Sequence, residues 1–308
     1  MHFTLPFSSW LILLATLFMW SGNWIVARAV RDDIAPGIAT AGRILVVLAI
    51  LLPFTLKGLR QKLPALSRGE WAILAALGFT AGGPHMAVQW LGLHYTTATS
   101  GILYLSSTPI FILLFALPLG ERIGPKQWIG VLISLCGVAT IATQGSLARL
   151  SSLSFNIGDM MALGSMIMFA AYTVLLRVRR FALDIVELLV MVCVAGLLFM
   201  LPWVAVELAL GAKVQINTAG ALAILYSALC SQLLAYLGWS HVVMRMGAGL
   251  AGVTMHLMPA MGVGLAALFL REYPAWFHFA GIALILAGVA ISSGKVNIRK
   301  LASEERMR

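Results

Sequence analysis

Two stretches of this chain, "GERIGPKQWIGVLISLCGVATI" at residues 120–141 and "LREYPAWFHFAGIALILAGVAI" at residues 270–291, share an order of residues that decides the fold. The matched pairs are all 151 positions apart: Glu121 with Glu272, Gly130 with Gly281, and Gly137 with Gly288. Glycine alone recurs by chance in apolar sequence, but an ordered acid, glycine, glycine series does not readily do so. The two stretches therefore indicate an internal repeat.

The repeat extends upstream of these stretches at nearly the same separation. Further matches are Pro109 with Pro259, Trp20 with Phe169, and Arg28 with Arg177. We therefore expect a first unit at residues 1–145 and a second at 146–294, followed by a basic tail at 295–308.

The composition places both units in a membrane. Hydrophobic residues make up 61% of the 308 positions and charged residues only 10%, whereas a soluble domain carries about 25% charged residues. Apolar runs of about 20 residues follow one another, each long enough to cross the hydrocarbon core as a helix. The predicted spans are 10–27, 36–56, 71–92, 97–119, 126–143, 159–178, 184–206, 218–240, 249–270 and 275–293.

The distribution of basic residues predicts the orientation of these ten transmembrane helices. With the N-terminus cytoplasmic, the inner segments hold 15 Lys and Arg residues and the outer segments hold five. This bias favours both termini in the cytoplasm. Because each unit has five spans, the second unit enters from the opposite side. The predicted fold is an all-α membrane protein of two inverted five-helix repeats, an arrangement typical of carriers.

Two motifs carry a resemblance to a known family. "LFMWSGNWIVAR" at 17–28 and "GERIGPKQWIGVLISLCGV" at 120–138 resemble the EamA-type drug/metabolite transporter superfamily, and within it the YddG-type exporters of aromatic and amphipathic amino acids. The resemblance implies a multi-pass carrier in a bacterial inner membrane, with a central cavity that opens alternately to each side.

Polar and aromatic residues inside the spans are the candidate site. Such residues are costly in a bilayer and usually face a cavity or another helix. The predicted substrate-binding residues are Trp20, Asn23, His85, Gln89, Tyr104, Ser107, Phe169, Tyr172, Gln232, Tyr236 and His256. Helix-breaking residues recur at matched positions in the two repeats and predict hinges at Gly82, Pro84, Pro109 and Pro259.

Several of these assignments have a structural alternative. Asn23 makes either an interhelical hydrogen bond or a ligand contact. His85 and His256 are either satisfied core residues or cavity residues. Arg43, about 10 Å into the second span by helical rise, either snorkels to the outer surface or pairs with a substrate carboxylate. Trp24 shares one helical face with Trp20 and Asn23 in the first span. Most other tryptophans lie near predicted span ends and are typical of an interfacial belt: Trp10, Trp71, Trp90, Trp128, Trp203, Trp239 and Trp276.

These residue types favour a ligand with an apolar body and a polar head. We expect a secondary transporter that exports small amphipathic metabolites, foremost aromatic and other neutral amino acids. No carboxylate lies at the middle of a predicted span, which argues against cationic drugs and leaves coupling open between a histidine proton route and facilitated diffusion.

Other function classes find less support. A nucleotide-sugar carrier of the same fold would need cavity Lys or Arg for phosphate, and a membrane-embedded enzyme or lipid-binding scaffold is the alternative outside transport. Metal, phosphate-loop and nucleophile motifs are missing from the sequence, so we expect no enzyme activity, metal or cofactor. The expected partners are a small-molecule substrate and membrane lipid, with no nucleic acid, and a monomer would suffice.

Overall fold

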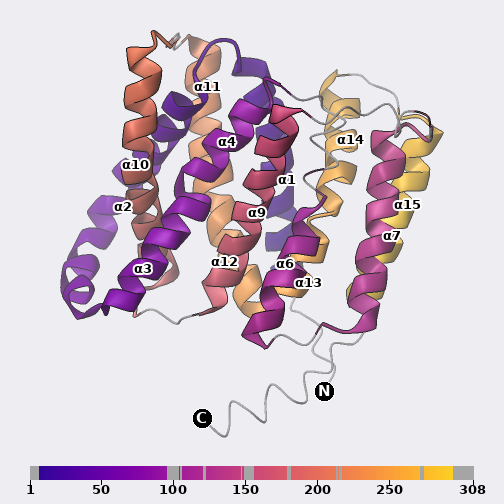
Figure 1. Ribbon diagram of the computed structural model, residues 1–308, viewed down its shortest axis with the longest axis horizontal. Helices are drawn as coiled ribbons and strands as arrows, with labels where there is room; N and C mark the ends of the chain where they lie inside the picture. The colour runs from indigo at the N-terminus through magenta and orange to yellow at the C-terminus, as the bar shows by residue number, and fades with distance from the viewer. Residues whose placement is uncertain are drawn as a thin grey trace, which may run out of the picture.

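A computed structural model describes residues 7–95, 104, 106–120, 123–146, 148, 156–178, 182–212, 214, 217–270 and 274–293. The predicted tail at 295–308, Glu121, Glu272 and the first residues of the predicted fourth span lie outside these ranges. The described chain is helical apart from one isolated β-bridge between Ile34 and Val214. The chain is drawn in Figure 1.

The helices follow the order α1 (Phe7–Val30), α2 (Pro36–Lys62), η1 (Leu63–Ala65), α3 (Arg68–Leu77), η2 (Gly78–Gly82), α4 (Pro84–Gly92), α6 (Thr108–Ala116), η3 (Leu117–Leu119), α7 (Pro125–Ala142), α9 (Ile157–Val178), α10 (Ile185–Ala209), α11 (Thr218–Tyr226), η4 (Ser227–Leu234), α12 (Ala235–Met246), α13 (Ala248–Thr254), α14 (Leu257–Leu270) and α15 (Trp276–Ser293).

Eight helical segments within the described residues are long and apolar enough to cross a membrane. They are Ser8–Ala27, Pro36–Ala65, Arg68–Gly92, Pro125–Ala142, Ile157–Val178, Ile185–Ala209, Thr218–Met246 and Ala248–Leu265. The predicted fourth and tenth spans coincide with two shorter apolar helices, Thr108–Leu119 and Trp276–Ser292. The all-helical, multi-span architecture is therefore as predicted, while the count of ten spans and the orientation of the termini stay predictions.

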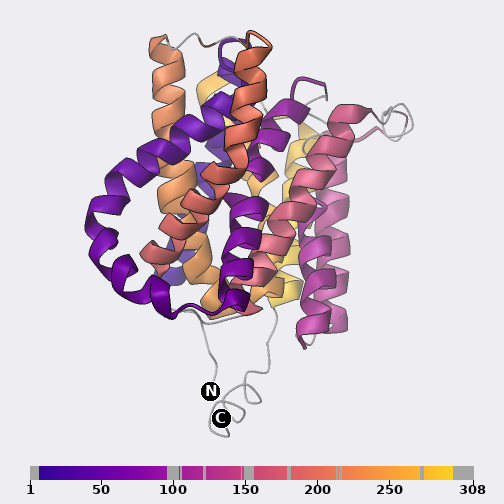
Figure 2. The same ribbon diagram turned by 60° about the vertical axis from the view of Figure 1, so that its left-hand side comes forward.

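Helices α7 and α15 form a close antiparallel pair at one end of the molecule, visible in both views (Figures 1 and 2). Their glycines meet directly: a Cβ atom on Gly137 would lie 2.5 Å from the carbonyl oxygen of Gly281 and 2.9 Å from the backbone nitrogen of Ile285. Gly130 and Gly288 approach each other in the same way. The repeated glycines of the sequence thus allow the two backbones to touch.

Helices α2 and α10 also run antiparallel, and a glutamate of α10 joins them at each end. Near the start of α10, Glu187 accepts a 2.6 Å hydrogen bond from Nζ of Lys62 on α2. Near its end, Glu207 accepts hydrogen bonds of 2.9 and 3.0 Å from the backbone nitrogens of Gly37 and Ile38. The second contact places a negative charge at the N-terminus of α2, where free backbone donors and the helix dipole favour it.

The predicted break at Gly82 and Pro84 is present and has an unexpected form. The chain is π-helical over η2, then leaves helical geometry at Gly83, and α4 starts with Pro84. A second π-helix, η4, begins at Ser227, which lies 149 positions after the start of η2. Short π-helical segments are frequent at functional sites, because they leave backbone groups outside the regular ladder.

The predicted prolines lie at helix starts rather than within bent helices. Pro109 is in the first turn of α6, where a missing N–H costs nothing. The turn before it is closed by Ser107, whose backbone nitrogen and Oγ both donate to the carbonyl oxygen of Tyr104, at 2.9 and 2.6 Å. Pro259 likewise follows an interruption at Met255 and His256, between α13 and α14. Each proline therefore follows a turn of the chain, at residues 104–107 before Pro109 and at Met255 and His256 before Pro259.

The contact of Glu187 yields a stability prediction. Its side chain is 5% exposed and also accepts from the backbone nitrogen of Asp184 at 2.8 Å. Because a buried acceptor loses a charge-assisted bond, Glu187→Gln is expected to lower the free energy of unfolding by about 1–3 kcal/mol. Asp32→Asn is the control, since the Arg31–Asp32 pair is exposed and such pairs contribute about 0–1 kcal/mol. Equal losses in SDS-unfolding titrations would contradict the prediction.

Candidate functional site

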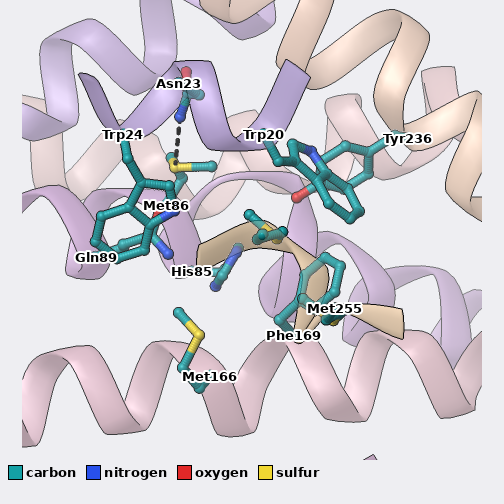
Figure 3. A pocket seen from close by; sticks show the side chains of 11 residues that line it. Trp20, Asn23, Trp24, His85, Met86, Gln89, Met166, Phe169, Tyr236 and Met255 are labelled. Carbon is teal, nitrogen blue, oxygen red and sulfur yellow. Dashed lines mark hydrogen bonds between the residues drawn. The ribbon is translucent and has the colours of Figure 1, made fainter. Parts of the chain in front are cut away.

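A small cavity of about 30 Å³ lies where helices from both predicted repeats converge (Figure 3). Its lining consists of Trp20, Asn23 and Trp24 from α1, His85, Met86 and Gln89 from α4, Met166 and Phe169 from α9, Tyr236 from α12, Met255 from the turn before α14, and Met258 from α14. Figure 3 shows α1 and α9 supplying opposite walls, with His85 between them. The cavity holds no more than a few water molecules in this conformation.

An aromatic cluster closes one side of the cavity, with Trp20 at its centre. The ring of Trp20 lies 5.2 Å from that of Phe169 in an edge-to-face arrangement, and 5.8 and 5.3 Å from those of Tyr236 and Trp239. Its Nε1 donates a 3.1 Å hydrogen bond to the carbonyl oxygen of Ser231 in η4. Each such ring pair stabilises the fold by about 0.5–1.5 kcal/mol beyond the contribution of the buried area, so the cluster holds this side of the cavity in place.

The polar residues of the cavity are held by neighbouring helices. Nδ1 of His85 lies 2.9 Å from both the carbonyl oxygen and the hydroxyl of Ser165. Asn23 accepts a 2.7 Å hydrogen bond from the hydroxyl of Ser227, and its amide nitrogen lies 3.8 Å from the sulfur of Met86. Asn23 therefore makes the interhelical hydrogen bond expected of it and still lines the cavity.

The structure brings six of the eleven predicted site residues together around this cavity: Trp20, Asn23, His85, Gln89, Phe169 and Tyr236. Two more lie in the layer behind them. Tyr172 packs against the rings of Phe169 and Tyr236, and its hydroxyl lies 3.3 Å from that of Ser240. Gln232 is fully buried, with its amide nitrogen 3.6 Å from the sulfur of Cys193.

The other three predicted site residues lie at the turns before Pro109 and Pro259 instead. His256 is fully buried, and its Nε2 is 2.9 Å from the carbonyl oxygen of Ser106. Tyr104 and Ser107 belong to the turn before α6. The contact between His256 and Ser106 joins the two turns, so these residues connect the regions that precede Pro109 and Pro259.

Sequence reasoning missed five lining residues, namely Trp24 and the four methionines Met86, Met166, Met255 and Met258. Two sequence signals could have identified four of them. Trp24 shares a helical face with Trp20, and three of the methionines flank the helix breaks. Methionine is flexible and polarisable, and it suits surfaces that adapt to ligands of different shape.

Two of the expectations for buried and interfacial residues are wrong. Trp239 and Trp90 are not part of an interfacial belt: Trp239 is fully buried, donates to Thr173 Oγ1 at 3.1 Å and joins the aromatic cluster, and Trp90 is 4% exposed. Helix α12 continues to Met246, so Trp239 lies well inside it. Arg43 does not snorkel, because its side chain is fully buried within the protein.

The described residues that line the cavity include no carboxylate. The buried acids of the described residues, Asp159 and Glu187, lie in the first turns of α9 and α10. Within the described ranges, His, Cys, Asp and Glu side chains form no group of three or more that could hold a metal ion.

Comparison with known proteins agrees with this architecture. A relative in Archaeoglobus fulgidus, an uncharacterized transporter, is 27% identical over 92% of this chain and 97% of its own length. YetK, an uncharacterized transporter of Bacillus subtilis, is 25% identical over 88% of this chain and 82% of its own. A probable terminal-alkyne amino-acid exporter of Streptantibioticus cattleyicolor is 25% identical over 71% of each chain. A crystal structure of a protein 19% identical in sequence superposes with a TM-score of 0.72 over 93% of this chain and 96% of that one, which shows a shared fold.

The chain matches the EamA-like transporter family twice, at residues 7–143 and at residues 156–294. These two matches account for nearly all of the helices described above, including every residue that lines the cavity. The chain is therefore a multi-pass membrane transporter that belongs to the EamA-like transporter family, in the drug/metabolite transporter superfamily.

Proposed function

We propose that this protein is a secondary transporter of a bacterial inner membrane that exports small amphipathic metabolites, foremost aromatic and other neutral amino acids. The observation that carries the proposal is the cavity between α1, α4, α9 and α12, which combines aromatic and methionine walls with Asn23, His85 and Gln89. Ring stacking would hold an apolar side chain and the amides and imidazole would hold a polar head. The probable terminal-alkyne amino-acid exporter of Streptantibioticus cattleyicolor, a relative over 71% of the chain, supports the same substrate class.

The proposed mechanism is alternating access by two inverted repeats with both termini cytoplasmic. Contacts between residues about 150 positions apart support it, because residues on a pseudo-twofold axis meet their own counterparts. Trp20 contacts Phe169, His256 contacts Ser106, and Ser134 donates to the carbonyl oxygen of Ile285 at 3.4 Å. The glycine contacts of α7 with α15 fit the same symmetry in another way: Gly137 meets Gly281 and Gly130 meets Gly288, so the repeat exchanges one contact with the other. This axis would pass through the cavity wall.

The small size of the cavity means that it must widen during the transport cycle. Sites for small molecules usually measure about 300–1,000 Å³, so a cavity of about 30 Å³ is too small for an amino acid in this conformation. Widening it requires the cavity-lining helices to separate. The interrupted regions at Gly82–Pro84, Pro109 and Pro259 are the proposed hinges, since few regular backbone bonds must break there.

Transport into proteoliposomes tests the proposal. We expect saturable uptake of radiolabelled phenylalanine and tryptophan, competition by leucine, and no uptake of glutamate or UDP-glucose. Liposomes without protein are the control. Imposing a pH gradient distinguishes a histidine proton route from facilitated diffusion, as only the former accelerates uptake. Uptake of UDP-glucose without uptake of any neutral amino acid would replace this proposal with a nucleotide-sugar carrier.

A further inference from the structure

Arg43 is the most costly unexplained group among the described residues. It lies seven residues after the start of α2, and its side chain is fully buried. None of its three side-chain nitrogens, Nε and the two Nη atoms, has a hydrogen-bond partner among the described residues. A guanidinium carries five N–H donors and a permanent charge, and burying such a group without a partner is strongly unfavourable.

Among the described residues, none supplies a counter-charge to Arg43. The titratable groups that interact with its charge are Tyr236, Cys193 and His85, and none of these is a carboxylate. Helix α10, which packs along α2, carries its described acids Glu187 and Glu207 at the two ends, and both already accept hydrogen bonds there. A counter-charge for Arg43 would therefore have to come from a group other than the described residues.

The position of Arg43 relates it to the cavity. Two of the groups that interact with its charge, Tyr236 and His85, line the cavity, while Arg43 itself does not, so the guanidinium lies near the cavity but outside its lining. The hydroxyl of Tyr236 donates a 3.1 Å hydrogen bond to the carbonyl oxygen of Ala81 in the π-helix η2. A movement of η2 would therefore carry Tyr236 with it and change the barrier between Arg43 and the cavity.

We infer that Arg43 is the binding group for the carboxylate of the substrate, which a wider conformation admits past Tyr236. A guanidinium matches a carboxylate with two parallel N–H···O bonds, and such charge-assisted pairs are strong in a dry site. The inference rests on the proposed function and deepens it, because it specifies ligands with an apolar body and a carboxylate. The unpaired amide oxygen of Gln232, beside Cys193, offers an acceptor for an ammonium group in the same region.

The test uses four compounds that share one phenyl ring: phenylalanine, 3-phenylpropionate, phenylalaninamide and phenethylamine. Only the first two carry a carboxylate. Thermal unfolding of the purified protein in nanodiscs is followed with each compound, for the wild type and for Arg43→Met. We expect the two carboxylates to stabilise the wild type, and Arg43→Met to bind them about 10- to 100-fold more weakly while its response to the amide and the amine is unchanged.

Arg60→Met is the matched control, since Arg60 lies on the same helix and is exposed. It should respond like the wild type. Arg43→Lys keeps a charge and should restore part of the carboxylate response. Without ligand, Arg43→Met should melt at the same temperature as the wild type or higher, because an apolar side chain relieves an unpaired buried charge. A lower melting temperature would show a structural role for Arg43 and overturn the inference.

Two further outcomes separate the inference from the function it rests on. If the carboxylates and the amide stabilise Arg43→Met as they do the wild type, the inference fails although neutral amino acids can still be transported. If sodium chloride stabilises the wild type more than sodium methanesulfonate does, and carboxylates add nothing, Arg43 binds an inorganic anion and the inference fails. Proteoliposome uptake of phenylalanine by the wild type independently decides the proposed function.

Discussion

Trp20→Ala is expected to lower the free energy of unfolding by about 3–5 kcal/mol, the usual cost of truncating a buried tryptophan. The side chain is 7% exposed, touches three other rings and donates to Ser231. The substitution removes the shared centre of the aromatic cluster and leaves a void next to the cavity. Reversible SDS unfolding followed by circular dichroism would measure the loss.

Trp276→Ala is the matched control for this experiment. Trp276 is 65% exposed at the start of α15, so its truncation should cost less than about 1 kcal/mol. Under the proposed function, Trp20→Ala should also lower phenylalanine uptake per folded molecule, whereas Trp276→Ala should not. A similar stability for the two variants would show that Trp20 contributes no more than a tryptophan in contact with lipid.

Gly137→Leu is expected to lower the free energy of unfolding by about 3 kcal/mol or more. Its Cβ atom would overlap the backbone of α15 at Gly281 and Ile285, and backbone cannot move aside as a flexible side chain can. Because α7 and α15 pack mainly against each other, the variant should separate the pair. A disulfide-trapping or fluorescence-quenching assay between the two helices would detect the separation.

Gly164→Leu provides the control for that variant. A Cβ atom on Gly164, in α9, would meet no atom within 4 Å, and a helix-forming residue replaces a poor one. The expected change is neutral or stabilising by less than about 1 kcal/mol. If both leucine variants are equally stable, the glycine contacts between α7 and α15 are not required for their packing.

Much of the fold could be predicted from the sequence, because apolar runs and helix breakers act through residues that lie next to one another in the chain. The helical spans and the break at Gly82–Pro84 follow from such local patterns. The π-helical form of that break could not be foreseen. It occurs where Gly82 closely approaches Gly196 of α10, a contact between distant parts of the chain.

The candidate site was predicted less completely, for a related reason. Trp20 and Asn23, two polar or aromatic residues singled out within the first span, both line the cavity. Whether Trp239 or Arg43 faces lipid depends on which helices cover it, and this is set by tertiary packing. Distance from a span end was therefore a poor guide for both residues, each of which is fully buried.

The contacts between counterpart residues have a further consequence for a carrier. In a protein of two identical inverted halves, exchanging the roles of the halves converts the inward-facing shape into the outward-facing one, so the two shapes have equal free energy. Here the counterparts that meet are chemically different, tryptophan with phenylalanine and serine with histidine. Under the proposed cycle, sequence differences between the halves remove the degeneracy, and unlike pairs such as these contribute to which side of the membrane the resting transporter faces.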